Sequence, residues 1–275
     1  MPELPEVETI KRTLERLVEN KTIADVDVYW GKIIKHPDDV EQFKSLLIGQ
    51  TIRRLSRRGK LLLFHLDDYR LVSHLRMEGK YRVVPKTTEK DKHTHVIFTF
   101  EDGDALHYRD VRKFGTMHLF PNGEEMKRDP LKRLGPEPFD ESFHFDYFKE
   151  KLQKTERVIK AVLLDQTVVA GLGNIYVDEA LFKARVHPER RANTLTDDEI
   201  ERIRKTAVET LREAVELGGT TIRSYVNSQG DMGMFQQKLS VYGQEHEPCV
   251  DCGAEIIKLK VAGRGTHICP SCQPL

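Results

Sequence analysis

The sequence predicts an α+β protein in which an N-terminal helix and a β-sandwich precede a helical domain and a small cysteine-rich hairpin. Apolar residues recur at helical spacing near the start, short β-branched segments follow, and helical patterns return after a proline-rich linker. We divide the chain into a helix and β-sandwich at 1–120, a linker at 121–144, a helical domain at 145–235 and a four-cysteine finger at 236–275.

The first predicted element is a helix over residues 2–20. Its apolar residues recur at intervals of three and four and form one stripe, which predicts burial of one face. Pro2 and Pro5 fall in the first turn, where a missing backbone N–H costs little. The stripe consists of Leu4, Val7, Ile10, Leu14, Leu17 and Val18.

From about residue 22 to residue 119 the pattern changes to short segments rich in β-branched and aromatic residues, separated by Gly, Asp or Lys. Many short strands behind a single helix are typical of a β-sandwich or a barrel. The stretch "FPNGEEMKRDPLKRLGPEPFDES" then interrupts the pattern with four prolines and two glycines, which indicates a linker between domains.

Helical patterns dominate after the linker, in "RVIKAVLLD", "IYVDEALFKARV" and a long segment over 196–219. The long segment begins with Thr196 and has Glu199 three residues later, which predicts a capping box. It ends at Gly218 and Gly219, as helices commonly do.

The composition is that of an ordinary globular protein, with 39% hydrophobic and 32% charged residues. No stretch is apolar and long enough for a bilayer, and no basic-then-apolar leader opens the chain, so we expect a cytoplasmic protein without a membrane partner. A net charge of zero and a pI near 7.2 argue mildly against a nucleic-acid binder. The run Arg53–Lys60, however, holds five basic residues in eight, as either a solvated face or a phosphate track.

All four cysteines lie near the end of the chain, as two C-x2-C pairs separated by 16 residues. Four thiolates at this spacing predict a tetrahedral zinc site in a reducing compartment. The pairs are Cys249 with Cys252 and Cys269 with Cys272. The spacer reads as a hairpin with Arg264 between two glycines, which suits a phosphate, although a purely structural zinc knuckle is the commoner use.

Two further motifs carry candidate chemistry. In "GLGN", two glycines lead into Asn174 at the start of a helix, whose free N–H groups form either an anion site or an ordinary helix corner. The chain begins "MPELPEVET", with Glu3, Glu6 and Glu8 near the start of a helix and a proline after the initiator Met1. An acidic helix start explains the glutamates, whereas Pro2 is either a helix-initiating proline or a residue with its own chemistry.

Taken together in this order, "MPELPEVET", "GLGNIYVDE" and a four-cysteine finger with "GRGT" resemble bacterial formamidopyrimidine-DNA glycosylases, from Pro2 to Cys272. The resemblance implies a helix–two-turn–helix motif in the helical domain and one structural zinc in the finger. It implies a monomeric repair enzyme that removes oxidised purines, chiefly 8-oxoguanine and formamidopyrimidines, from double-stranded DNA. The strand is then cut at the abasic site by β- and δ-elimination. Because all four zinc ligands are thiolates, no coordination position is left for a catalytic water.

The resemblance also assigns roles to residues. Met1 is removed, and the exposed amine of Pro2 attacks the sugar carbon to form a Schiff base. Glu3 moves protons to and from the opening sugar ring, and Glu6 supports the first helical turn. Lys60 contacts phosphate near the lesion and aids catalysis. Arg264, which the resemblance places in the catalytic group, also contacts phosphate.

The resemblance assigns DNA-binding roles to further positions. Those matching backbone-phosphate contacts are His74, Asn174, Tyr242 and Lys258, and His93 matches a further DNA-binding position. Met77, Arg112 and Phe114 match the side chains that fill the gap left by an extruded base. From the pattern alone, Phe114 reads as a core residue. The segment 218–235 resembles a loop that covers the extruded base.

Two rival functions follow from the same residues. An endonuclease VIII-like glycosylase for oxidised pyrimidines has the same fold and chemistry, and the trio Met77, Arg112 and Phe114 favours the purine enzyme over it. A non-catalytic zinc-finger DNA-binding protein is the rival from another class. Pro2 with Glu3 argues against it, because a binding module has no use for a secondary amine.

Overall fold

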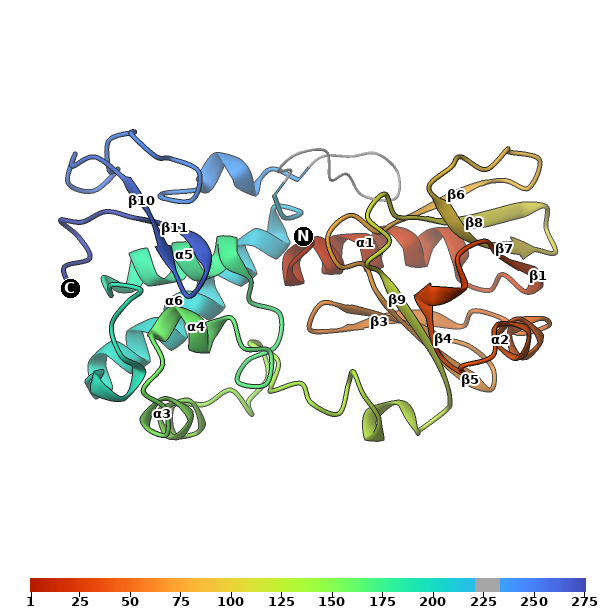
Figure 1. Cartoon of the computed structure of the whole chain (residues 1–275), viewed down its shortest axis with the longest axis horizontal. Coiled ribbons are helices and arrows are strands. Elements are labelled where there is room, and N and C mark those ends of the chain that lie inside the picture. Colours follow the sequence, from red (N-terminus) through yellow and green to blue (C-terminus); the bar gives the residue numbers. More distant parts are fainter. Residues whose placement is uncertain (221–232) are drawn as a thin grey trace. The chain divides into compact units, whose positions relative to one another are not determined.

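The structure is a computed structural model that describes residues 1–220 and 233–275 (Figure 1). The chain forms two compact units. The N-terminal unit is built mainly from residues 6–132, with Met1 and Pro2, and the C-terminal unit from residues 133–220 and 234–275 together with Glu3–Pro5. The predicted α+β class is confirmed, whereas the finer four-part division remains a prediction.

Helix α1 (Leu4–Val18) begins two residues later and ends two residues earlier than predicted. Pro2 therefore precedes the helix, and Pro5 lies in its first turn. The apolar stripe is buried as expected, since Val7, Ile10 and Leu14 lie in the core of the N-terminal unit, at 2% exposure or less. Leu4 instead belongs to the core of the C-terminal unit.

Two sheets form most of the rest of the N-terminal unit. The first is antiparallel, in the order β1 (Ile23–Val28), β7 (Thr94–Phe100), β8 (Asp104–Arg109) and β6 (Lys80–Pro85). The second has the order β2 (Ile34–His36), β9 (Thr116–Pro121), β5 (Tyr69–His74), β4 (Leu61–His65) and β3 (Arg54–Arg58). Only the β2–β9 pair in this sheet is parallel. Both sheets and α1 contribute to one core, and α1 runs between the sheets (Figure 1). The unit is therefore a sandwich rather than a barrel.

Helix α2 (Val40–Leu47) lies inside the segment that was expected to form strands, and its helical pattern was not predicted. Asp39 caps it by accepting hydrogen bonds from the backbone N–H groups of Glu41 and Gln42, at 2.7 and 3.0 Å. The helix buries Phe43 and Leu47, which are four residues apart. Two short 3-10 turns also belong to this unit, η1 (Gly31–Ile33) and η2 (Glu125–Lys127).

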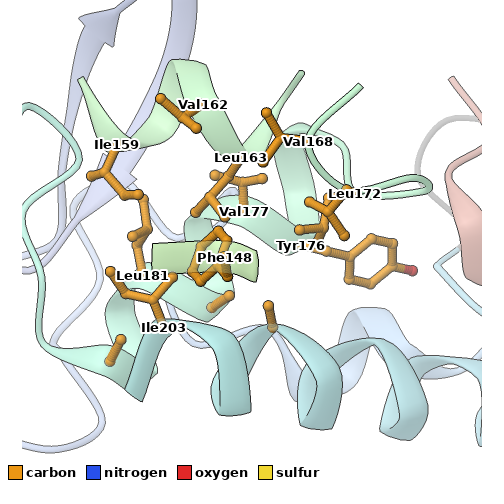
Figure 2. Packing of buried hydrophobic residues seen from close by; sticks show 14 of the residues in the cluster. Phe148, Ile159, Val162, Leu163, Val168, Leu172, Tyr176, Val177, Leu181 and Ile203 are labelled. Carbon is orange, nitrogen blue, oxygen red and sulfur yellow. The ribbon is translucent and has the colours of Figure 1, made fainter. Parts of the chain in front are cut away.

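The C-terminal unit contains α3 (Phe145–Gln153), α4 (Ile159–Leu163), α5 (Asn174–Ala184) and α6 (Asp197–Glu216), with η3 (Ala192–Thr194) and η4 (Phe235–Lys238). The capping box of α6 is confirmed, because Thr196 Oγ1 accepts from the N–H of Glu199 and Glu199 Oε2 accepts from the N–H of Thr196. Figure 2 shows Val177 and Leu181 of α5 packed among Phe148, Leu163 and Ile203 from the other helices.

Helix α5 is the most deeply buried helix that the structure describes, since nine of its eleven residues are buried. The zinc-finger hairpin, β10 (Ile257–Val261) and β11 (Arg264–Ile268), belongs to the same unit. Its two-residue turn is Ala262–Gly263, with both φ angles positive. Arg264 therefore opens β11 and pairs with Val261, just beyond the tip where the sequence placed it. Among the described residues, no helix is long and apolar enough to cross a membrane.

Candidate active site

The Gly-Leu-Gly-Asn segment holds the chain's own N-terminal residues. The backbone N–H of Leu4 donates to Gly171 O at 3.1 Å. Oε1 of Glu3, a residue only 3% exposed, accepts a hydrogen bond from the N–H of Ile175 at 3.2 Å, in the first turn of α5. The positive end of the helix dipole stabilises a carboxylate at this place. The predicted anion site therefore exists, and the anion in it is Glu3.

Both glycines of this segment make room for that contact. A Cβ on Gly173 would lie 2.2 Å from Cδ of Glu3, and a Cβ on Gly171 would lie 2.4 Å from Cδ1 of Leu4. Gly171 also has a φ of +98°, which favours glycine. Gln166, which the sequence analysis missed, fixes the segment by accepting from the N–H of Gly171 at 2.9 Å and donating to Leu172 O at 2.8 Å.

Pro2 is buried beside Glu3, whereas Met1 is 49% exposed. While Met1 is attached, the nitrogen of Pro2 is an amide whose lone pair is delocalised, and it is a poor nucleophile. Removal of Met1 converts this nitrogen into a secondary amine. The exposure of Met1 leaves it accessible for removal.

Lys60 and His74 lie near one another in the N-terminal unit. Lys60 is 6% exposed in the turn between β3 and β4, and His74 is paired with the next residue, Leu61. Burial, helped by the charges of Arg76 and Lys60, lowers the pKa of His74 to about 3. Nδ1 of His74 accepts from the N–H of Arg76 at 2.9 Å, so the single proton resides on Nε2. His74 therefore offers a neutral N–H donor.

The basic run Arg53–Lys60 is not one continuous exposed stripe. Residues Arg54–Arg58 of the run form β3, where successive side chains alternate between faces. Arg57 is paired with Glu8 at 3.2 Å and is 9% exposed, whereas Arg53 is paired with Asp67 at 2.6 Å. Both open interpretations of the run, a solvated face and a phosphate track, treated its charges as equivalent. The structure shows that these charges differ in their partners and in their exposure.

The three predicted gap-filling residues lie on two loops of the N-terminal unit. Met77, 38% exposed, is in the loop 75–79 between β5 and β6. Arg112 and Phe114 are in the loop 110–115 between β8 and β9, with the guanidinium 4.7 Å from the centre of the phenyl ring. Phe114 is 52% exposed, so its interpretation as a core residue is wrong. His93 adjoins this loop, since its carbonyl accepts from the N–H of Asp110 at 3.0 Å.

The remaining predicted contact residues gather around the hairpin of the C-terminal unit. Nδ2 of Asn174 donates to Gly265 O at 2.9 Å, which joins the start of α5 to the residue after Arg264. The Tyr242 ring packs edge-on against His267, with ring centres 5.0 Å apart. Lys258 lies 3.6 Å from Glu245, so this cation has an acidic neighbour that the sequence analysis did not foresee.

Two buried acids of α5 hold these segments in place, and the sequence analysis missed both. Asp178 forms a fully buried ion pair with Lys160 at 2.5 Å and accepts from the N–H of His267 at 3.0 Å. Burial lowers the pKa of Lys160 even beside this carboxylate. Lys160 also donates to Oγ1 of Thr266 at 2.7 Å. The signal was present in the sequence, as charged residues inside the apolar segments "VIKAVLL" and "NIYVDEALF".

Glu179 binds the chain that precedes the finger. Its carboxylate accepts three backbone hydrogen bonds, from Ser240 and Val241 at 2.9 Å and from Tyr242 at 2.8 Å. Glu179 is 0% exposed, and burial raises its pKa. Three N–H donors on one carboxylate form a rigid connection, so this contact fixes the backbone that carries Tyr242.

The four cysteines form a site that fits zinc. Their Sγ atoms all lie within 4.8 Å of one another, and those of Cys249 and Cys272 are 3.9 Å apart. Tetrahedral zinc with Zn–S bonds near 2.3 Å places sulfur atoms about 3.8 Å apart. Four thiolates fill such a site. Gln273 anchors the finger to the rest of its unit, because it accepts from the N–H of Cys269 and donates to Val186 O.

The loop predicted to cover an extruded base, 218–235, falls mainly on residues 221–232, which lie outside the described residues.

Gly173→Ala is expected to displace Glu3 from the start of α5. The φ of Gly173 is −133°, which alanine adopts readily, so the effect is purely one of space. Loss of the acceptor should speed amide exchange at Ile175 and destabilise the C-terminal unit by about 1–3 kcal/mol. Gly31→Ala is the control, because the nearest atom is the end of the Val40 side chain at 3.1 Å. An unchanged exchange rate at Ile175 would contradict this role of Gly173.

Removing zinc, with a chelator or by Cys249→Ser, is expected to unfold the finger and leave the N-terminal unit folded. The finger's own apolar cluster is small and includes Cys249 and Cys269 themselves, so metal binding supplies most of its folding free energy. Zinc content and amide exchange in β10 and β11, compared with β4 and β5, measure this. A verified zinc-free protein whose hairpin stays protected would show that the fold does not need the metal.

Comparison with known proteins identifies the family. The family model for the N-terminal domain of formamidopyrimidine-DNA glycosylase matches residues 1–117. The model for the H2TH domain of the same enzyme matches 134–226, and that for the zinc finger found in FPG and IleRS matches 247–275. The finger is thus a zinc finger with one structural zinc.

Similar proteins cover the chain over its whole length. Formamidopyrimidine-DNA glycosylase of Oceanobacillus iheyensis is 62% identical over 100% of this chain and 98% of its own. That of Bacillus licheniformis is 61% identical, over 99% of each chain.

Solved structures of formamidopyrimidine-DNA glycosylases are also similar to this chain over its whole length. A variant of the Lactococcus lactis enzyme in complex with Fapy-dG-containing DNA is 46% identical, covers 100% of both chains and has a TM-score of 0.94. The Lactococcus lactis enzyme in complex with DNA containing an abasic site has a TM-score of 0.93, at 46% identity over 99% of this chain and 100% of its own. The chain belongs to the formamidopyrimidine-DNA glycosylase family and is a DNA glycosylase of base-excision repair with a four-cysteine zinc finger.

Proposed function

We propose that this enzyme excises oxidised purines, chiefly 8-oxoguanine and formamidopyrimidines, from double-stranded DNA and then cuts the strand at the abasic site. The observation that carries the proposal is the fixed carboxylate of Glu3 at the start of α5, one residue from Pro2. Relatives support it, because the Lactococcus lactis enzyme binds DNA containing Fapy-dG or an abasic site. We further propose that the enzyme acts as a monomer in the cytoplasm.

The chemistry begins at the amine of Pro2 after Met1 has been removed. An α-amino group titrates near pH 8, so a useful fraction is neutral at physiological pH. The neutral amine attacks the sugar carbon that bears the damaged base, and the base leaves with the electron pair of the glycosidic bond. Opening of the sugar ring gives an iminium, which acts as an electron sink. Loss of a sugar C–H proton then expels the 3′ phosphate, and a second elimination expels the 5′ phosphate.

Glu3 is suited to the proton transfers of this sequence. Its carboxylate accepts a hydrogen bond from the first turn of α5 and lies directly against the backbone of Gly173, which restricts its movement. We assign it acceptance of the proton that the amine of Pro2 loses on attack and delivery of that proton to the sugar oxygen as the ring opens. Lys60 is assigned the phosphate beside the lesion.

The remaining residues position the duplex. Backbone-phosphate contacts are assigned to His74, Asn174, Tyr242, Lys258 and Arg264, and a further DNA contact to His93. His74 would donate as a neutral imidazole, since its pKa near 3 keeps it uncharged throughout the physiological range. Met77, Arg112 and Phe114 are assigned to the gap left by the extruded base, which suits three exposed side chains on neighbouring turns.

The direct test is covalent trapping. The isolated protein should lack Met1, and borohydride should link Pro2 to a duplex that contains 8-oxoguanine, because reduction of the iminium makes the bond permanent. A panel of duplexes that carry one oxidised purine, one oxidised pyrimidine or no lesion gives the substrate class. Trapping on Lys60, or preferential action on the pyrimidine lesion, would overturn the assignment.

Arg112 is expected to set the preference for the base opposite the lesion. Its guanidinium is a planar donor, and cytosine offers it two adjacent acceptors, whereas adenine presents a donor beside one acceptor. Excision of 8-oxoguanine should be about ten- to a hundredfold faster opposite cytosine, from roughly 1–3 kcal/mol of discrimination.

Arg112→Ala should lower activity and flatten that preference, whereas Lys113→Gln on the same loop should not. Single-turnover excision opposite each base measures both effects. A preference that survives Arg112→Ala would remove this residue from the role.

Arg264→Ala is expected to weaken binding to damaged and undamaged duplexes alike. A phosphate contact carries no sequence information, and its loss should reduce the slope of log affinity against log salt by about one. Lys154→Ala removes the same charge from an exposed position in the C-terminal unit and serves as the control. A loss confined to one lesion would mean that Arg264 contacts the base.

A further inference from the structure

The loops that carry the three gap-filling residues meet at one buried side chain, that of Tyr108. Tyr108 lies on β8 and is 0% exposed. A Cβ on Gly79, in the loop with Met77, would lie 2.3 Å from its hydroxyl oxygen. A Cβ on Gly115, in the loop with Arg112 and Phe114, would lie 1.8 Å from the same atom. The hydroxyl thus occupies space that only glycine leaves open on both loops.

Space, not backbone conformation, explains these two glycines. Neither Gly79 nor Gly115 is among the described glycines with a positive φ. Other L-residues adopt such backbones without strain. The Tyr108 hydroxyl is therefore a steric constraint at both glycines, and at Gly79 the carbonyl oxygen of Leu75 is a second one, 2.6 Å from a Cβ.

Asp110 ties one of these loops to the same place. Its carboxylate, 0% exposed, accepts from the N–H of Arg112 at 3.0 Å and from the N–H of Gly115 at 2.8 Å. Its carbonyl accepts from Nε2 of His95 at 2.7 Å. The buried carboxylate of Asp110 thus closes the loop that carries Arg112 and Phe114, and Gly115 of this loop packs against the Tyr108 hydroxyl.

Each loop also holds a residue in an unfavourable conformation. Arg76 precedes Met77 and has a φ of 52°, and Lys113 lies between Arg112 and Phe114 and has a φ of 58°. The left-handed region is unfavourable for a residue other than glycine. Such residues persist where the surrounding structure determines them, so both loops are held by their contacts.

We propose that Tyr108 is a positioning residue that fixes the two loops relative to each other, so that Met77, Arg112 and Phe114 enter the gap in the DNA as one rigid set. The role of these three residues rests on the proposed function. The coupling of the two loops through Tyr108 is a property of the free protein and is testable without DNA.

Tyr81 provides a matched control for Tyr108→Phe. Its ring packs edge-on against that of Tyr108, with centres 5.0 Å apart, and it is equally part of the core. Its hydroxyl donates to Oγ of Ser73 at 2.8 Å and is not among the atoms nearest to either glycine. Tyr81→Phe therefore removes a buried tyrosine hydroxyl from the same stack without disturbing the loop contacts.

The first experiment measures amide exchange in the free protein at Gly79, Arg112 and Gly115. Tyr108→Phe should speed exchange at all three amides, whereas Tyr81→Phe should leave them unchanged at a similar overall stability. Faster exchange in only one loop, or the same change in both variants, would overturn the coupling.

A steric test keeps the inference falsifiable if Tyr108→Phe folds poorly. Gly115→Ala should loosen both loops, and adding Tyr108→Phe should partly restore them, because the nearest tyrosine atom then becomes Cζ at 2.8 Å. Tyr108→Phe should not restore Gly79→Ala, whose Cβ would still lie 2.6 Å from Leu75 O. Equal rescue of both variants, or of neither, would count against the hydroxyl as the contact.

Activity separates this inference from the proposed function. If the wild type excises 8-oxoguanine, Tyr108→Phe should slow single-turnover excision about ten- to a hundredfold through misplacement of the gap-filling set. It should also flatten the preference for cytosine opposite the lesion and leave binding to undamaged duplex unchanged. Wild-type inactivity would refute the proposed function alone, whereas an active wild type with Tyr108→Phe equal to Tyr81→Phe would refute the positioning role.

Discussion

The hydrogen bond between Glu3 and the first turn of α5 is the contact on which the candidate active site depends, because it fixes the end of a chain that would otherwise fray. Terminal residues are usually mobile unless something holds them. Here the carboxylate gains the dipole and a free N–H of a buried helix, and Leu4 packs into the core of the same unit. An amine at Pro2 would then be attached to a fixed neighbour on its C-terminal side, and its freedom would be small enough for directed attack.

Helix α5 supports this contact because it is itself held firmly in the C-terminal unit. Its apolar residues pack in the core, and its two buried acids bind different segments of the chain. Asp178 holds Lys160 and the backbone of β11, and Glu179 holds residues 240–242. Breaking such a buried pair by removing one partner typically costs about 3–5 kcal/mol, because the other charge is left uncompensated. One helix thus fixes Glu3, the finger and the segment with Tyr242. Losing one of its buried charged contacts is costly because the partner group would be left buried without compensation.

The features that could be predicted from the sequence are those determined by the spacing of residues close together along the chain. The stripe of α1, the capping box of α6 and the four-cysteine finger all depend on residues close together along the chain. Asp178 and Glu179 escaped prediction because their partners lie elsewhere along the chain, as with Glu179 and Val241, which are 62 positions apart. Helix α2 was missed because its eight residues are too few for a clear helical period among strands. The partners of the basic run could not be predicted, because counting charges ignores strand alternation and the acids across the fold, such as Glu8 opposite Arg57.

At two places in the structure, a pair of glycines lets a side chain pack directly against the backbone. Gly171 and Gly173 make space for Leu4 and Glu3, and Gly79 and Gly115 make space for the hydroxyl of Tyr108. In both cases a side chain from a distant segment fits against bare backbone, so the two segments approach more closely than any Cβ would allow. Interiors pack too tightly to yield by even a methyl group, which makes such a fit stiffer than a contact between two flexible side chains. Under the proposed function, such rigidity in the loops that carry Met77 and Phe114 would let these exposed side chains enter a gap in the DNA without first being ordered.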